Sequence, residues 1–275
     1  VRGWDTIVKH LAVAPSVSLA LGSVAGIGAA RVATSHYSVI VKDSAQMMIA
    51  GPALVDWANL GEVSKEELGA AKIHTRNGAI DEQANSEAEA FALAQRFLSY
   101  LPSNVDELPP IEESSDDPNR TDEALLSIVP KDPRKVYKMR RIIDSVLDAE
   151  SFFEIGSRWG RSITTGFGRL AGIPVALFAE NPMIYGGAWT ADACRKLIRF
   201  IDLAGTFHLP LVHLEDCPLR LHLEFYYSLL DCLCKDLKLP IKDYHFHHFV
   251  NSRWSQMHTI LASSSFCHGE NILVF

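Results

Sequence analysis

The sequence has little of what marks a membrane, secreted or nucleic-acid-binding protein. No apolar run reaches the roughly 20 residues that a helix needs to cross a bilayer, so we expect no membrane partner. The five cysteines are odd in number and irregularly spaced, which favours a reducing environment over a disulfide framework. The net charge of −7 argues against nucleic acid as a partner, because phosphates attract basic surfaces.

Recognisable catalytic and metal-binding arrangements are also lacking. We identify no Ser/His/Asp or Cys/His constellation along the chain. The C-terminal region does contain Cys232 and Cys234, several histidines within residues 245–248, and the pair Cys267-His268. These residues do not have the spacing that brings four side chains to a tetrahedral zinc ion. We therefore predict that the chain binds no metal.

Strand-like and helix-like patterns alternate along the chain. Apolar runs at residues 17–21, 37–42 and 209–214 are typical of buried strands, whereas residues 86–101 and 191–207 have helical periodicity. This alternation predicts an α/β fold. A chain of 275 residues can form one large domain or two smaller ones.

Several polar and glycine residues are expected to serve local structure. His74 lies in a segment that we interpret as a loop, where a histidine usually makes a hydrogen bond and no more. Gly186 and Gly187 lie between a strand and a helix, which favours a structural turn. The basic positions of the 191–207 helix are expected to face solvent: Arg195, Lys196 and Arg199.

The stretch from residue 15 to residue 52 organises the chain. An apolar run leads into the small-residue segment 22–30, and strand-like sequence resumes at Tyr37. Glycines let a backbone approach a ligand closely, and the N-terminus of a helix adds a positive dipole. The same pattern also serves to pack a helix closely on a sheet, so by itself it leaves both interpretations open.

Three segments in a fixed order are more specific than the glycines alone. Residues 22–28 read GSVAGIG, residues 45–52 read AQMMIAGP, and residues 66–74 read EELGAAKIH. In order and spacing they resemble the carboxyltransferase (β-type) subunits of biotin-dependent acyl-CoA carboxylases, which act on propionyl-CoA, acetyl-CoA or methylcrotonyl-CoA. The resemblance implies a crotonase-like (ClpP/crotonase) ββα-superhelix with two related domains, both incomplete here.

The resemblance continues through residues 132–182 and stops at Pro218. It implies that residues 1–107 are the C-terminal part of the N-terminal carboxyltransferase domain and that residues 121–218 begin the C-terminal one. Residues 108–120 are acidic and proline-rich, as expected of a linker. Residues 219–275 form a divergent tail of unknown role, with a possible helix at 222–237. We expect the chain to be incomplete at both ends relative to the family.

The family moves a carboxyl group from carboxybiotin to the α-carbon of an acyl-CoA, using backbone amides as an oxyanion hole. By resemblance, that hole for biotin consists here of Gly26, Ile27 and Gly28. Ile27 replaces a glycine of the family, and its side chain would crowd the biotin ring or resist a positive φ. The surrounding residues expected to bind the cofactor are Gly22, Ser23, Ala25 and Ala29.

The resemblance also implies the reaction partners. Biotin is carried on a partner domain or subunit, the acyl-CoA is the substrate, and no metal is held by this chain. The expected protein partners are a biotin carboxylase or biotin carboxyl carrier subunit and further copies of the chain itself. Two alternatives stay open: a catalytically inactive truncated paralogue or isoform that only binds partner subunits, and a crotonase-type hydratase or decarboxylase.

Overall fold

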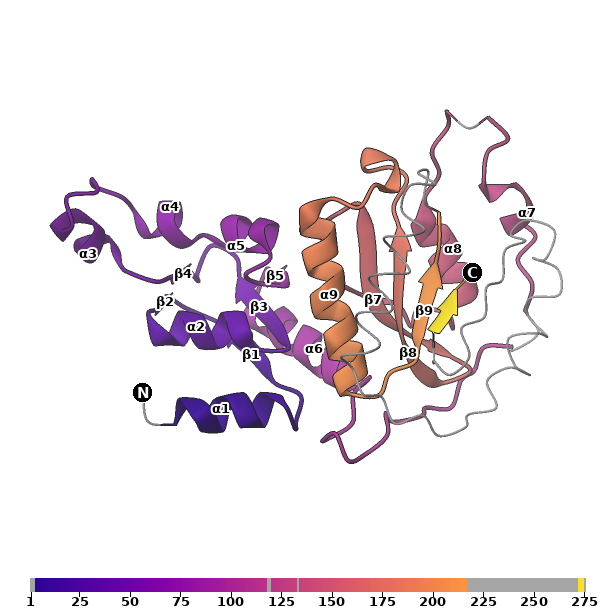
Figure 1. The fold of residues 1–275 in the computed structure, drawn as a ribbon, viewed down its shortest axis with the longest axis horizontal. Coiled ribbons are helices and arrows are strands. Elements are labelled where there is room, and N and C mark those ends of the chain that lie inside the picture. Colours follow the sequence, from indigo (N-terminus) through magenta and orange to yellow (C-terminus); the bar gives the residue numbers. More distant parts are fainter. Residues whose placement is uncertain (1–2, 118–119, 133, 217–271, 275) are drawn as a thin grey trace.

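Two lobes, one from each half of the chain, pack side by side, with the long helix α9 (Ala191–Thr206) along their junction (Figure 1). The computed structural model describes residues 3–117, 120–132, 134–216 and 272–274. Both lobes combine strands and helices, which agrees with the predicted α/β fold. No helix in the described ranges combines the length and the apolar character needed to cross a bilayer.

The first lobe is built on two small parallel sheets. One has the strand order β1-β3-β5, and the other is the pair β2-β4. The central strand β3 is buried at every position, which explains its continuous apolar sequence. The elements are α1 (Trp4–Leu11), β1 (Val17–Ala20), β2 (Val24–Ala25), α2 (Ile27–Thr34), β3 (Tyr37–Val41), β4 (Met47–Met48), α3 (Pro52–Trp57), α4 (Lys65–Gly69), α5 (Ala71–Asn77), β5 (Glu82–Ala84) and α6 (Glu87–Leu98).

The second lobe is a mixed sheet in the order β10-β9-β8-β7-β6. Its centre is the antiparallel hairpin β7–β8, which turns at Ala171 and Gly172, both with positive φ (50° and 80°). Two consecutive residues of that kind make the tight turn whose twist suits a hairpin. The elements are α7 (Leu125–Ile128), α8 (Met139–Val146), β6 (Phe153–Ile155), β7 (Ile163–Leu170), β8 (Ile173–Glu180), the short 3₁₀ helix η1 (Tyr185–Gly187), α9, β9 (Leu211–Leu214) and β10 (Ile272–Val274).

The two lobes share one hydrophobic core. The Tyr37 ring of β3 stacks on Phe97 of α6 at a centroid distance of 4.6 Å and meets Phe153 of β6 edge-on at 5.5 Å. Phe97 also lies 5.5 Å from Phe167 of β7, which in turn lies 5.8 Å from Phe200 of α9. Aromatic packing of this kind is continuous from one lobe to the other, so the halves support each other.

The buried guanidinium of Arg169, on β7, also holds the lobes together. It donates to the Ser99 carbonyl at the end of α6 (2.9 Å), to the Pro110 carbonyl in the predicted linker (3.0 Å) and to the Gly172 carbonyl in the hairpin turn (3.0 Å). It also pairs with the Glu112 carboxylate at 2.6 Å. The predicted linker runs over the surface but is fixed to the second lobe; the domain boundary at 108–120 stays a prediction.

Contrary to the expectation from the sequence, two of the three basic residues of α9 do not face solvent. Lys196 is buried, and its Nζ donates to the carbonyls of Trp159 (3.1 Å) and Ile163 (2.6 Å). Burial lowers the pKa of Lys196 to about 8. Arg199 forms a two-point ion pair with buried Asp81 of the first lobe, both N–O distances being 2.9 Å. Arg195 is exposed, as predicted.

Most of the tail lies outside the described residues. This applies to the predicted helix at 222–237 and to the cysteine and histidine pairs that we considered as zinc ligands. From the tail, the structure describes β10, which adds to the sheet in parallel with β9.

We predict that Arg169→Leu destabilises the protein by about 2–4 kcal/mol, because four acceptors, three of them carbonyls, lose a charged donor at once. The matched control is Arg195→Leu, at a solvent-exposed position of α9, which should change stability by less than about 0.5 kcal/mol. Urea denaturation measures both. Equal effects for the two variants would show that Arg169 does not join the lobes.

Candidate functional site

The three sequence segments that carry the family resemblance meet in space. Strand β2 pairs in parallel with β4 through the Val24 N–H, which donates to the Gln46 carbonyl at 2.7 Å. The other edge of β4 faces the third segment, through a β-bridge between Gln46 and Ala70 and through contacts with α4. Residues that are more than twenty positions apart in the chain are thus paired, and the three segments form one small unit of structure beside α2 (Figure 1).

The junction of α4 and α5 lies very close to β4. A Cβ atom on Gly69 would overlap the Met47 backbone, so only glycine permits this approach. The Nε2 atom of His74 lies 2.6 Å from the carbonyl oxygen of Met47. The expectation that His74 lies in a loop is wrong: it is part of helix α5, and its side chain is partly buried.

A chain of side-chain hydrogen bonds crosses the same unit. The Ser23 hydroxyl donates to Gln46 Oε1 at 2.6 Å, and Gln46 Nε2 donates to Glu66 Oε1 at 3.2 Å. Gln46 is only 7% exposed, so its amide is committed to these neighbours. Ser64 and Glu67 form a capping box, which fixes the start of α4 and with it the position of Glu66.

Gly26 makes the turn from β2 into α2. Its φ of 61° and ψ of −127° belong to a region that side-chain-bearing residues avoid, so glycine is required for backbone reasons. Gly28 has a different role: a Cβ there would lie 3.1 Å from the Val24 side chain, a tight contact that glycine avoids. The glycines at positions 26 and 28 thus hold α2 close against β2 and bring its first turn to the surface.

The backbone amides at this turn differ in their availability. The Gly26 N–H is already used, donating to the carbonyls of Met48 and Ile49 at 3.1 Å each. In the described part of the chain, the N–H groups of Ile27, Gly28 and Ala29 have no protein acceptor. The first amides of a helix are normally unpaired and lie at the positive end of its dipole. The Gly26 N–H is thus engaged within the turn, whereas the three N–H groups that follow it are free; the role of these residues as an oxyanion hole stays a prediction.

Ile27 does not strain this turn. It has ordinary helical geometry as the first residue of α2 and is not among the residues with positive φ. Its side chain is 49% exposed. The Ile27 side chain is therefore compatible with the backbone and does not need to be buried in the core.

The remaining residues predicted to bind a cofactor have different surroundings. Gly22 has open space where a side chain would lie, and Ala25 is exposed at the end of β2. Ser23 is exposed, but its hydroxyl is engaged by Gln46. The Ala29 side chain is buried in the core, so only its backbone can contribute.

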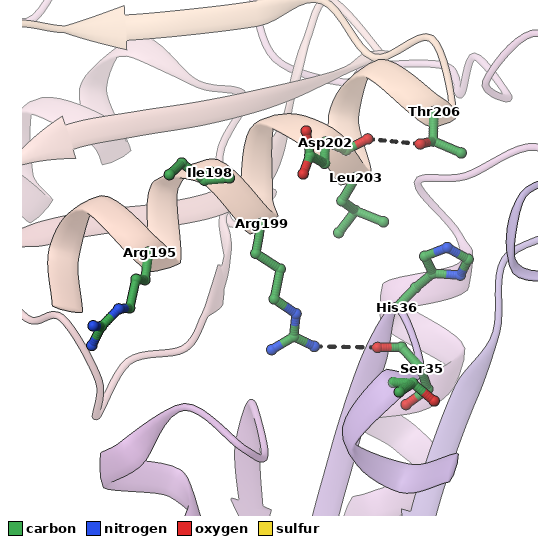
Figure 2. A pocket seen from close by; sticks show the side chains of 9 residues that line it. Ser35, His36, Arg195, Ile198, Arg199, Asp202, Leu203 and Thr206 are labelled. Carbon is green, nitrogen blue, oxygen red and sulfur yellow. Dashed lines mark hydrogen bonds between the residues drawn. The ribbon is translucent and has the colours of Figure 1, made fainter. Parts of the chain in front are cut away.

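A cleft of about 370 Å³ lies at the opposite end of α2, between Thr34–His36 and α9 (Figure 2). Its polar groups are largely paired: Arg199 donates to the Ser35 carbonyl at 3.2 Å as well as to Asp81, and His36 Nδ1 accepts the Ser16 N–H at 3.0 Å. The pKa of His36 falls to about 4, chiefly because burial disfavours the charged ring. This cleft is a junction between the lobes and is separate from the free amides.

Sequence reasoning missed a buried polar network at the ends of β8 and β9. Glu180 and His213 are fully buried, with Nε2 3.0 Å from a carboxylate oxygen. The indole N–H of Trp189 and the backbone N–H of Asp216 donate to the same carboxylate, each at 3.0 Å. Burial raises the pKa of Glu180, but the neighbouring His213 and hydrogen bonds from backbone N–H groups, including that of Asp216, outweigh it, and the net shift is downward. Gly187 adjoins Glu180, which confirms a structural turn at the two glycines.

Comparison with known proteins gives a consistent result. Residues 5–218 match the family model of the carboxyl transferase domain. The chain is 35% identical to the propionyl-CoA carboxylase beta chain of Roseobacter denitrificans over 207 residues, 75% of this chain and 41% of the relative. It is 32% identical to the methylmalonyl-CoA decarboxylase subunit alpha of Veillonella parvula, again over 75% of this chain and 41% of the relative. The chain thus spans about two fifths of the length of these curated relatives.

Comparison with solved structures gives a similar result. The solved structure of transcarboxylase 12S superposes with a TM-score of 0.74 at 27% identity, covering 82% of this chain and 45% of the other. The mixed α/β architecture and the crotonase-like fold expected from the sequence agree with this likeness.

We predict that Gly26→Ala destabilises the protein by about 1–3 kcal/mol, since alanine resists the backbone conformation of this turn. Gly22→Ala is the control: it has no neighbour within 4 Å and no positive φ, so its effect should be small. Thermal unfolding compares the two. If Gly26→Ala proved as stable as Gly22→Ala, the turn would not have this geometry in solution.

Proposed function

The chain belongs to the carboxyl transferase domain family, and we propose that it transfers a carboxyl group from carboxybiotin to the α-carbon of an acyl-CoA. The proposal is supported by the match over residues 5–218 and by the likeness to a propionyl-CoA carboxylase beta chain. The observation that carries it is the set of unpaired amides at Ile27 and Gly28, placed beside the family's second and third segments. The acyl chain of the substrate is left open.

The free amides fit what this chemistry requires. Carboxybiotin, when bound, supplies the carboxyl group, and negative charge develops on its ring oxygen as that group leaves. The N–H groups of Ile27 and Gly28 lie at the positive end of α2, so they are suited to stabilise that oxygen. The Ala29 N–H extends the same set by one donor. No acidic or basic side chain of the chain is needed for this stabilisation.

The neighbouring residues have supporting parts in this proposal. Gly22 and Ala25 leave space beside the turn, and Ser23 fixes Gln46 of the second segment. Gly26 contributes its backbone conformation, which directs the following amides outward.

The proposed domain division follows the family. We assign residues 1–107 to the C-terminal part of the N-terminal carboxyltransferase domain, 108–120 to the linker, and 121–218 to the first part of the C-terminal domain. The proposed partners are a biotin carboxylase or biotin carboxyl carrier subunit and copies of the chain itself. The transcarboxylase 12S structure is described as a hexamer assembly with hydrolysed methylmalonyl-CoA bound, which supports a homo-oligomer acting on an acyl-CoA.

A second candidate function is decarboxylation of an acyl-CoA coupled to biotin, favoured by the 32% identity to a methylmalonyl-CoA decarboxylase subunit. The same amides would serve this reaction, because negative charge develops on the same biotin ring oxygen. The direction of transfer distinguishes the two functions. A carboxylase labels the acyl-CoA from labelled carboxybiotin, whereas a decarboxylase labels biotin from a labelled malonyl-type thioester.

We predict that Ile27→Pro lowers the rate of carboxyl transfer by about 10²–10³-fold, the usual effect of removing one oxyanion donor. Proline is well tolerated at the first position of a helix, so this variant removes an N–H without unfolding α2. Transfer of a radiolabelled carboxyl group from a carboxylated biotin carrier to propionyl-CoA measures the rate.

Ile27→Ala is the matched control for this variant, because it shortens the side chain and keeps the N–H. It should retain most of the activity of the unchanged chain. Equal rates for Ile27→Pro and Ile27→Ala, with both proteins folded, would remove the Ile27 amide from the mechanism.

A further inference from the structure

We propose that His74 is a positioning residue for the amide turn, holding β4 in place so that β4 in turn holds the Gly26 turn. The functional meaning of this inference rests on the proposed carboxyl transfer, but its structural content does not. The imidazole is one strand removed from the free amides and takes no part in the chemistry itself.

The first step of the argument concerns the two edges of β4. In a parallel pair, successive carbonyls of a strand point to opposite sides. The carbonyls of Gln46 and Met48 point toward β2, where they accept the N–H groups of Val24 and Gly26. The Met47 carbonyl therefore points away from β2, toward helices α4 and α5.

The second step concerns what meets that outward carbonyl. Met47 is buried, so without a hydrogen-bond donor its carbonyl oxygen would be shielded from water and left unpaired. Proteins normally avoid the free-energy cost of such an unpaired oxygen. His74 Nε2 lies 2.6 Å from it, and in the described part of the chain this is the donor that reaches it. Gly69 makes the approach possible, because a side chain there would overlap the same backbone.

The third step concerns the state of the ring. A carbonyl oxygen can only accept, so the proton must be on Nε2 for this bond to form. Nδ1 is buried and has no hydrogen-bond partner. The ring therefore makes a single polar contact, and that contact is with β4, as expected of a residue whose role is to hold one backbone oxygen.

The last step connects β4 with the site. Both two-residue strands are too short to be stable alone, so each depends on what covers its other edge. The Gly26 N–H is held by the carbonyls of Met48 and Ile49, directly after the residue that His74 fixes. Loss of the His74 bond should therefore loosen the Gly26 turn and misdirect the amides of Ile27 and Gly28.

The test uses amide hydrogen exchange of the full chain, followed by mass spectrometry, in three variants. His74→Leu removes the donor. His74→Gln places an amide N–H within reach of the Nε2 position, whereas His74→Asn, its matched control, places one near the Nδ1 position, short of Met47. We expect peptides covering residues 24–28 and 46–49 to exchange about tenfold faster in the Leu and Asn variants, roughly the effect of one lost hydrogen bond.

His74→Gln should restore slow exchange in those peptides, and peptides from β7 and β8 should stay as slow as in the unchanged chain in all three variants. Unchanged exchange at residues 24–28 in His74→Leu would overturn the proposal. A uniform increase that includes β7 and β8 would also overturn it, because His74 would then be a general stabiliser.

An activity measurement separates this inference from the proposed function. The rate of carboxyl transfer at saturating acyl-CoA should fall in His74→Leu and recover in His74→Gln, with little change in KM for the acyl-CoA. If the unchanged chain transfers no carboxyl group, the proposed function fails while the exchange result still decides the role of His74.

Discussion

The pairing of two very short strands, β2 and β4, is the constraint on which the candidate site depends. Each has only two residues, yet together they fix the Gly26 turn through the Val24 and Gly26 amides. Helix α2 begins directly after this turn, and its first amides are unpaired because the first turn of a helix has no intrahelical acceptors. The donors proposed for catalysis are thus a consequence of how the turn is built.

The second lobe supports the site from a distance. The aromatic core runs from Tyr37 on β3 to Phe200 on α9, and the Asp81–Arg199 pair joins the same elements at the lobe junction. The strand β3 also carries β1 and β5, so the sheet beside α2 is held by residues of the other half of the chain. We therefore expect neither lobe to keep the geometry of the site without the other.

Local patterns in the sequence were sufficient to predict several main elements of the fold: strands β1, β3 and β9 and helices α6 and α9. The glycine segment and the two other segments that carry the family resemblance also located the candidate site, because the three segments meet in the structure. Contacts between distant segments were not predictable. The burial of Lys196 depends on the carbonyls of Trp159 and Ile163, and the role of His74 depends on a strand 27 residues earlier in the chain.

The most direct test of the account is the response of the individual backbone amides to biotin, observed by NMR of the isotope-labelled protein with a free biotin ester. We predict that the amide protons of Ile27 and Gly28 move downfield as they donate to the ring oxygen, while the Gly26 amide, already bonded within the β2–β4 pair, barely changes. A response centred on Gly26, or one confined to the cleft beside α9, would contradict the assignment of these amides as the oxyanion donors.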